Sequence, residues 1–447
     1  MKPLRIGLAS RLILLACCAA CFSFGQFPQN CRPSAAFAAA IRKQPSASVY
    51  DAGGAQFAQE GNLACAVAAF KLALRLDPNS AEAHYDLGVA LVRQRQLPQA
   101  AKQFRLALKT KPNQIQARNS LGAVLLDMGH AAEAQAEFET ALQLDPKSVF
   151  ALDRLAQALS AQRHYAAAIR YWKQALAIQP GSRDTLLSLG VALYQNGDAG
   201  GSIHILSKLV KAHPNFKSGH FNLANVFAHE SRFREAADEY AQVLRLAPGD
   251  DQARLAMVKA LVTVSAYQAA LAPAQAYTRR KPRDPDGHLL LGSVYRGLGL
   301  YHKAEGELQR AVAGKPNDPQ AQYELGFVLA RNHKPKEALA HMQKAVALKP
   351  SDTAAEFQMV GVFRTLGDPA RAAEIAAQFK KNKQQEFKRN ELAARGNQAN
   401  QLLKAGHPAK AAAIYRQMLQ VEPKNARTEY NLALALDAAH DLTGERQ

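Results

Sequence analysis

Apolar and small residues recur along the chain with a period of 34 residues from about residue 47 onward. Each period opens with apolar side chains three and four positions apart, as at Leu87, Gly88 and Leu91, which is the pattern of a helix with one buried face. A turn containing glycine or polar residues follows, and a second such series carries Ala100 and Phe104. Each period therefore predicts two helices joined by a short turn.

Proline marks the end of each period. The second helix should end there, because proline cannot extend the helical hydrogen-bond ladder. The prolines recur one period apart at Pro78, Pro112, Pro146, Pro180, Pro214, Pro248, Pro282, Pro316 and Pro350.

The second helix of each period carries a small residue, and in eight of the ten periods a bulky residue follows it four positions later. A small residue where two helices cross lets their axes approach, and a bulky neighbour fills the adjacent groove. The small residues are Ala66, Ala100, Ala134, Ala168, Ser202, Ala236, Ala270, Ala304, Ala338 and Ala372. The bulky residues are Phe70, Phe104, Phe138, Trp172, Leu206, Tyr240, Leu308 and Met342.

A single hairpin of this kind cannot bury its own apolar faces, so neighbouring hairpins must stack. The pattern resembles the tetratricopeptide repeat (TPR), and the resemblance covers about nine-tenths of the chain. It implies an all-α, right-handed α-solenoid of about eleven helix-turn-helix TPR units plus terminal half-units. Full units begin near residues 47, 81, 115, 149, 183, 217, 251, 285, 319 and 353.

The two ends of the repeat array depart from the period. Residues 26–46 are interpreted as a linker and an N-terminal capping half-repeat, because Phe37, Ala40 and Pro45 reproduce the spacing of a second helix. Ten tandem units should occupy 47–386. An eleventh unit with a terminal helix, expected at 426–438, and a polar tail should occupy 392–447.

The period fails once, near residue 384, where Gln384 replaces the expected proline. No Pro or Gly lies between Pro369 and Gly396, so residues 387–391 should be a helical insertion that continues one long helix into the next unit. This helix carries a basic cluster that could bind an acidic partner or could be ordinary solvated surface: Lys380, Lys381, Lys383, Lys388 and Arg389.

Residues 1–25 are typical of a secretory signal peptide, with basic residues before a short apolar run that ends at Phe24. Export to the periplasm or the medium is the first interpretation. A lipobox-like sequence ending at Cys17 gives the alternative of a lipid anchor in the envelope, and a retained segment is a third. The formal net charge of +19 would attract an anionic envelope polymer, a membrane face or an acidic protein.

Removal of the leader would leave two cysteines, Cys31 and Cys65. An oxidising compartment would permit a disulfide between them, and two unpaired thiols are the alternative.

The chain contains no recognisable catalytic motif. A phosphate-binding loop, a Gly-x-Ser-x-Gly elbow and a zinc-protease helix are all missing from the sequence. His84, His220 and His288 recur at one repeat position, which favours a role in packing over metal binding. We therefore expect neither catalysis, nor a cofactor, nor a metal. Nucleic acid is not an expected partner either.

The resemblance implies a binding surface on the first helix of each unit, formed by its fifth, ninth and twelfth residues. We call this surface the first-helix stripe. Its aromatic residues have two interpretations of equal weight: they pack against neighbouring units, or they are exposed anchors for a peptide. The candidate partner-binding residues are Tyr85, Asn119, Tyr194, Phe221, Asn225, Lys259, Arg296, Tyr323, Phe327, Phe357, Arg364, Asn400 and Tyr430.

Some family members grip a peptide carboxylate with a lysine and asparagines. Asn400 and Asn431 occupy such asparagine positions, but Gly396 stands where the lysine is expected, so we do not expect this clamp. The resemblance implies a protein- or peptide-binding scaffold or assembly factor of the bacterial cell envelope. The alternative is an adaptor in an envelope polysaccharide, secretion or pilus complex that binds glycan or an acidic partner.

Overall fold

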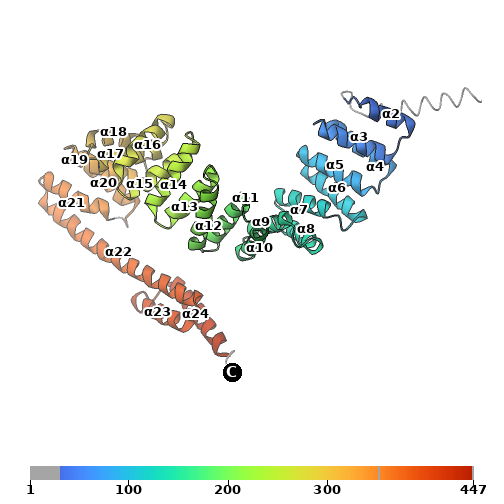
Figure 1. The fold of residues 1–447 in the computed structure, drawn as a ribbon. Coiled ribbons are helices and arrows are strands. Elements are labelled where there is room, and N and C mark those ends of the chain that lie inside the picture. Colours follow the sequence, from blue (N-terminus) through green and yellow to red (C-terminus); the bar gives the residue numbers. More distant parts are fainter. Residues whose placement is uncertain (1–30, 351–352, 445–447) are drawn as a thin grey trace, which may run out of the picture. The chain divides into compact units, whose positions relative to one another are not determined.

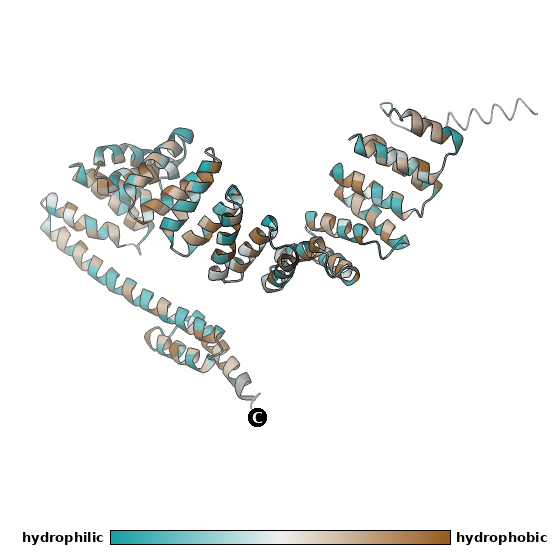
Figure 2. Ribbon diagram, viewed as in Figure 1, coloured by the Kyte–Doolittle hydropathy of each residue, from teal (hydrophilic) through white to brown (hydrophobic). Residues whose placement is uncertain are grey.

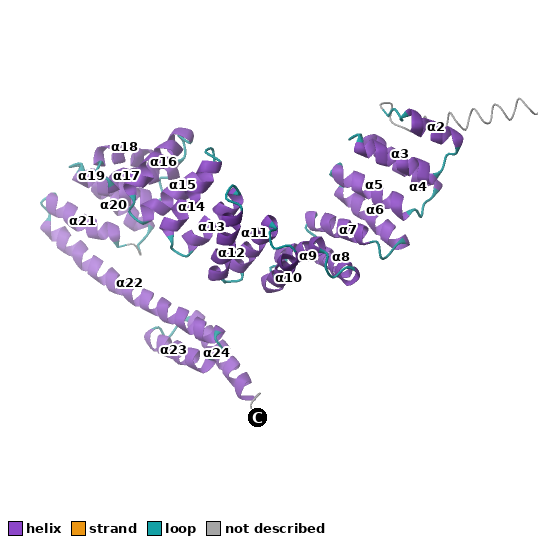
Figure 3. Ribbon diagram, in the orientation of Figure 1, coloured by secondary structure: helices purple, strands orange, loops and turns teal. Residues whose placement is uncertain are grey.

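The computed structural model describes residues 31–350 and 353–444, with side chains placed up to residue 440. All regular secondary structure in these ranges is helical, as Figure 3 shows. The signal peptide and Cys17 lie outside the described residues. The chain divides into two compact units after Pro248. The predicted all-α repeat fold is confirmed.

The first compact unit holds an N-terminal helix, α2, and six helical hairpins, each made of two successive helices (Figure 1). Their bounds are α2 Ala35–Lys43, α3 Ala47–Gln59, α4 Leu63–Leu76, α5 Ala81–Arg93, α6 Leu97–Thr110, α7 Ile115–Asp127, α8 Ala131–Leu144, α9 Val149–Ala161, α10 Tyr165–Ile178, α11 Arg183–Gln195, α12 Ala199–Ala212, α13 Lys217–His229 and α14 Phe233–Leu246.

The second compact unit continues the series of hairpins and ends in a different arrangement around one long helix. Its helices are α15 Asp251–Thr263, α16 Tyr267–Arg280, α17 Pro285–Gly297, α18 Tyr301–Gly314, α19 Pro319–Arg331, α20 Pro335–Leu348, α21 Ala354–Thr365, α22 Pro369–Lys404, α23 Pro408–Val421 and α24 Ala426–Gly444. Among the described residues, no helix is long and apolar enough to cross a membrane.

Local sequence explains where the helices begin and turn. Ser or Asp two residues after the proline caps many first helices; Ser80, for example, accepts a hydrogen bond from the backbone N–H of Ala83. The turn inside each hairpin contains one residue with positive φ, which glycine adopts most easily. These residues are Gly61, Arg95, Gly129, Arg163, Gly197, Ser231, Ser265, Gly299, His333, Gly367 and Gly406. They recur once per period as far as Gly367, and Gly406 follows after a longer interval, beyond the helical insertion.

The two helices of a hairpin meet where a bulky side chain lies over a small residue. In the second hairpin the Phe104 ring fills the space beside Gly88, and in the third the Phe138 ring fills the space beside Gly122. Phe104 and Phe138 are fully buried. Hydrophobic residues, brown in Figure 2, alternate with hydrophilic ones along the helices of the hairpins. This packing explains why a glycine or alanine recurs at the same place in the first helices.

Successive hairpins stack through another position of the second helix, which we call the stacking position. Tyr277 and Leu209 occupy it, and each lies against a glycine at the third residue of the following hairpin, Gly287 and Gly219 respectively. Within the two compact units, residues at the stacking position are buried in the hairpins that have a following hairpin: Ala73, Ala107, Ala141, Ala175 and Leu209, and then Tyr277, Ala311 and Ala345.

The recurring histidines form hydrogen-bonded links between a loop and a hairpin. His220 contacts the Pro214 carbonyl oxygen through Nε2 (2.9 Å) and the Glu239 carboxylate through Nδ1 (2.6 Å). His84 and His288 make equivalent contacts with the carbonyl oxygens of Pro78 and Pro282. Each link satisfies a backbone carbonyl at the loop, so these histidines join one repeat to the next by specific polar bonds as well as by packing.

The N-terminal half-repeat covers the first hairpin. Phe37 and Ile41 of α2 are buried, and the Phe37 ring lies edge-on to Tyr50, with ring centroids 6.3 Å apart. A disulfide joins Cys31 to Cys65 on α4, with Cα atoms 5.5 Å apart. In the chain-entropy account, closing a loop of this length stabilises the fold by about 3–4 kcal/mol. The end of the first hairpin is therefore covered and covalently fastened.

The C-terminal end differs from the regular hairpins. Helix α22 runs without a break from Pro369 to Lys404, through the place of the missing turn. Helix α24 extends to Gly444, so the expected end of the terminal helix at residue 438 was wrong. No proline follows residue 438 to stop the helix, and the residues after it continue the hydrogen-bond ladder.

The hairpin contact gives a prediction about two glycines. A methyl group at Gly122 would lie 2.7 Å from the Phe138 ring, whereas one at Gly306 of α18 would meet nothing within 4 Å. Gly122→Ala should therefore destabilise the array by about 1–3 kcal/mol, because the ring must move. Gly306→Ala should stabilise it by about 0.5–1 kcal/mol, because alanine favours the helix. Urea unfolding followed by circular dichroism measures both. Equal effects of the two substitutions would contradict this packing.

Candidate partner-binding surfaces

In the first compact unit, the candidate stripe residues Tyr85, Asn119, Tyr194, Phe221 and Asn225 are all half-buried. The Tyr85 ring packs against Phe104 of its own hairpin, 5.8 Å between centroids. Tyr194 packs against His229, 5.7 Å away, on the first helix of the next hairpin. These aromatic side chains therefore pack against other rings and also remain partly exposed to solvent.

A tyrosine orients the amide of Asn225. The Tyr240 hydroxyl donates to Asn225 Oδ1 at 2.6 Å. The amide oxygen is thus occupied, and the NH₂ group is left as a donor. The same bond recurs in the second compact unit, where the Tyr415 hydroxyl donates to Asn400 Oδ1 at 2.7 Å. Each of these asparagines can therefore donate to a carbonyl or carboxylate oxygen of a ligand.

In the second compact unit, the candidates range from half-buried to strongly exposed. Tyr323, Phe327 and Arg296 are half-buried, whereas Lys259, Arg364 and Asn400 are exposed. Phe357 and Tyr430 are also exposed, to 59% and 65%. Exposed aromatic rings of this kind are available to a partner.

Phe327 lies between two arginines. The guanidinium carbons of Arg296 and Arg331 are each 5.3 Å from the centre of its ring, a favourable cation–π distance. Arg296 also pairs with Glu324, at an N···O distance of 2.5 Å. Burial raises the pKa of Glu324, and the attraction of Arg296 opposes that rise only in part. Arg331 was not among the sequence candidates, since only the fold places it beside Phe327.

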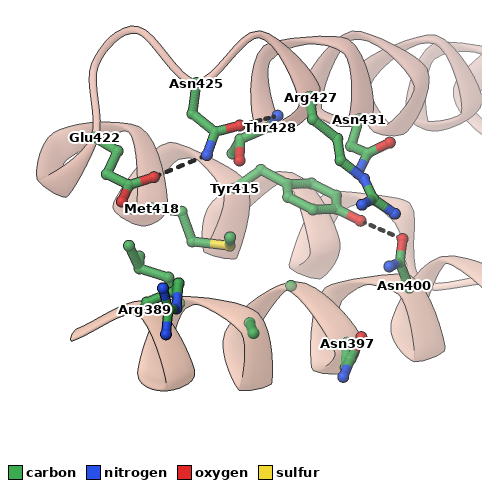
Figure 4. A pocket seen from close by; sticks show the side chains of 13 residues that line it. Arg389, Asn397, Asn400, Tyr415, Met418, Glu422, Asn425, Arg427, Thr428 and Asn431 are labelled. Atoms are coloured by element: carbon green, nitrogen blue, oxygen red, sulfur yellow. Dashed lines mark hydrogen bonds between the residues drawn. The ribbon is translucent and has the colours of Figure 1, made fainter. Parts of the chain in front are cut away.

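A polar pocket lies between α22, α23 and α24 (Figure 4). Its cavity measures about 270 Å³. The lining includes residues already named from the sequence: Arg389, Gly396, Asn400 and Asn431. Its polar lining includes Arg389, Asn397, Asn400, Tyr415, Arg427 and Asn431.

The pocket is rich in hydrogen-bond donors. Within residues 31–350 and 353–440, the side chains of Arg389, Arg427, Asn397 and Asn431 form no hydrogen bond or ion pair. The one carboxylate in its lining, Glu422, already accepts a bond from Asn425 Nδ2 at 2.8 Å, drawn in Figure 4. The pocket therefore suits a ligand that offers acceptor oxygens or negative charge.

Gly396 leaves the floor of this pocket open, and a methyl group there would lie 3.4 Å from the Met418 side chain. The basic groups come instead from Arg389, on the helical insertion, and Arg427, on α24. Arg427, Asn397 and Asn425 were not among the residues predicted from the sequence to form a site. No local signal could have found them, because they meet only when α22, α23 and α24 pack together.

An acidic group in the first hairpin was also missed. Asp51 occupies the stripe position of α3, and its Oδ1 atom is buried without a hydrogen-bond partner among the described residues. Burial, together with the nearby charges of Asp86 and Glu82, raises the pKa of Asp51 to about 6. Ionisation of this carboxylate therefore opposes folding at neutral pH. No group of three metal-binding side chains occurs within the described ranges.

The raised pKa of Asp51 predicts a pH-dependent effect of Asp51→Asn. The folded state holds the proton up to about pH 6, and the unfolded state releases it near pH 3.8. The stability that this group contributes is therefore present at low pH and is lost as the pH rises through 6. Asp51→Asn should raise the melting temperature at pH 7.5, with a gain that shrinks toward pH 4.

Thermal unfolding of wild type and variant across this pH range measures the difference. Asp238→Asn is the control, because Asp238 is exposed on α14. A gain that stays constant with pH would exclude the ionisation of Asp51 as its cause.

The chain matches several family models of the repeat. A tetratricopeptide repeat model matches residues 154–215, 187–251, 255–319, 289–353 and 397–447. A second tetratricopeptide repeat model matches residues 115–148, and a TPR repeat model matches residues 54–95. The first model alone covers more than half of the chain. No curated protein sequence matches the chain.

Solved structures with similar folds include PilF of Pseudomonas aeruginosa, at 18% identity and a TM-score of 0.39, over 46% of this chain and 94% of that one. MamA of Desulfovibrio magneticus RS-1 is 22% identical with a TM-score of 0.35, over 38% and 96%. A chain of the Cut9–Hcn1 complex is 15% identical with a TM-score of 0.37, over 96% and 94%.

The residues matched by the family models agree with the repeating hairpins and with the helix contacts described above. Together they support a protein-interaction scaffold, which is the function typical of this repeat. The chain belongs to the tetratricopeptide repeat family.

Proposed function

We propose that this protein is an exported scaffold that binds a polypeptide segment of a partner, and that the pocket between α22, α23 and α24 holds an acidic or carbonyl group of that segment. The observation that carries the proposal is the excess of donors in the pocket. Arg389 and Arg427 contribute two guanidinium groups, and the only lining carboxylate is already hydrogen-bonded.

The pocket is prepared for such a ligand before it binds. The Tyr415 ring is buried, and its hydroxyl fixes the Asn400 amide with the NH₂ group left to donate. Side chains that stand on packed helices lose less freedom on binding than side chains on loops do. An asparagine NH₂ can donate to a peptide carbonyl, and an arginine can bind a carboxylate through two parallel bonds. The arrangement therefore favours a peptide over an apolar small molecule.

The location and role in the cell envelope belong to the same proposal. The basic and apolar leader at residues 1–25 supports export. The disulfide between Cys31 and Cys65 supports an oxidising compartment, since such bonds are rare in the cytosol. A scaffold in that compartment would hold or order other envelope proteins during assembly.

The pocket is tested by removing both arginines. A random peptide library is selected on the full chain, and one enriched peptide is titrated against Arg389→Ala/Arg427→Ala. Enriched peptides should carry Asp, Glu or a free carboxyl terminus. The double substitution should weaken binding at least about tenfold, as expected for arginines at the centre of an interface. Arg416→Ala is the matched control, because Arg416 is exposed on α23 and lies outside the pocket lining.

Unchanged affinity in the double variant would exclude the pocket as the peptide site. Binding of envelope glycans, with no peptide enriched, would favour the polysaccharide adaptor instead.

Export is tested by the intact mass of the protein purified from its native envelope fraction. The mature chain should begin near Gln26, and its mass should be lower by two hydrogen atoms than that of the reduced chain. A lipid-modified Cys17 would establish a lipoprotein, and a cytosolic protein that retains Met1 would contradict export.

A further inference from the structure

Helix α22 serves two hairpins at once, and one face of its middle is uncovered. The other face contacts the start of α21, where Asn382 Nδ2 donates to Glu356 Oε1 at 2.7 Å and Thr353 Oγ1 donates to Glu386 Oε2 at 3.2 Å. Its first part packs against α21, and its last part packs against α23. The only buried residues of α22 are Ala372, Leu392 and Ala399, so none is buried from 373 to 391. Figure 2 shows hydrophilic residues along much of this stretch.

The uncovered stretch of α22 and the residues just after it contain the two positions that contact each other between regular hairpins. Phe379 occupies the stacking position of the tenth hairpin but is only half-buried, whereas Ala311 and Ala345 at that position in the two preceding hairpins are buried. Ala394, the third residue of the next unit, should face it but is exposed. Because both lie on one straight helix, fifteen residues place them about 22 Å apart. No first helix of a following hairpin covers Phe379.

A hollow of about 660 Å³ lies along this face of α22 and is lined by Phe379, Lys380, Lys383, Gln384, Phe387 and Lys388. Phe387 is 70% exposed, although it is a large apolar residue. The Phe379 ring is held by Phe357 of α21, with ring centroids 5.6 Å apart. The two phenylalanines of the hollow are eight residues apart, so they lie on one side of the helix.

The charge of this face is basic and largely uncompensated. The lining of the hollow includes three lysines and no acidic residue. Lys383 pairs with Glu386 at 2.9 Å. Within the described part of the chain, no ion pair is recorded for Lys380 or Lys388. An occupant should therefore bring apolar side chains for the two phenylalanine rings and carboxylates for these two lysines.

We propose that this face of α22, from Phe379 to Lys388, binds an acidic amphipathic helix of a partner protein. The partner helix takes the place of the first helix that covers the stacking position in the regular hairpins. This surface lies outside the pocket between α22, α23 and α24, and the proposal does not depend on that pocket. A second copy of the chain is a poor complement, because the full sequence has a formal net charge of +19, and removal of Lys2, Arg5 and Arg11 with the leader leaves 19 − 3 = +16 on each copy.

A partner helix is favoured over a lipid surface by the geometry of the repeat. At Tyr277 and Leu209 the same position receives the third residue of a neighbouring helix. Phe379 is therefore placed to receive a helix, and Phe387 lies two turns further along the same face.

The probe is a fluorescein-labelled peptide, stapled to be helical, with Leu and Ala on one face and Glu on the other. It should bind the full chain with an affinity that falls as salt rises. Phe387→Ser and Lys380→Glu/Lys388→Glu should each weaken binding at least about tenfold. Lys71→Glu/Lys102→Glu is the matched control, because it makes the same charge change at exposed positions of α4 and α6 and should leave binding unchanged.

Four results would overturn the proposal. The first is no binding to the wild-type chain, or binding to either α22 variant that is as strong as binding to the wild-type chain. The second is equal binding of a peptide with the same composition but shuffled faces. The third is that Phe387→Ser abolishes binding of anionic phospholipid vesicles but leaves binding of the peptide unchanged. The fourth is self-association, measured by sedimentation, that Phe387→Ser abolishes. Peptide selection at the Arg389 and Arg427 pocket is scored separately, so each proposal can fail alone.

Discussion

A bulky side chain of the second helix packed over a glycine or alanine of the first helix is the contact on which the structure depends. Phe104 over Gly88 and Phe138 over Gly122 show its closest form, since even one added methyl group would overlap the ring. This contact fixes how near the two helices lie, and so it fixes which side chains remain outside the hairpin. The stripe of the first helix and the stacking position of the second follow from that geometry.

No hairpin is complete without a neighbour, and the two ends of the chain meet this requirement differently. At the N-terminal end, α2 lays Phe37 over the first hairpin, and the disulfide to Cys65 fastens the segment. At the C-terminal end, α22 fails to turn, so Phe379 occupies a stacking position that no helix of a following hairpin covers. The N-terminal helix α2 therefore covers the apolar face of the first hairpin. On α22, by contrast, the apolar face around Phe379 stays open beside lysine side chains.

Polar groups add specificity to this apolar scaffold. The histidine links from His84, His220 and His288 join loops to hairpins and are used within the fold. The Tyr415 hydroxyl donates a hydrogen bond to Asn400 Oδ1, and the NH₂ group of Asn400 remains as a donor. Arg389 and Arg427 have no such internal role recorded in the described chain. A buried or oriented polar group supports the fold, while a donor that remains in a pocket is available to a ligand.

The sequence by itself determined the repeat, because a regular period of apolar positions and prolines permits only helical hairpins that stack. It also located the loss of the turn near Gln384, because no residue there can stop a helix. It left the pairing of Cys31 with Cys65 open, and it could not assign Arg331 to Phe327 or bring Arg389 and Arg427 to one pocket. Only tertiary structure decided these, because periodicity specifies which face of a helix is buried, whereas the neighbours of an exposed side chain depend on how separate helices pack.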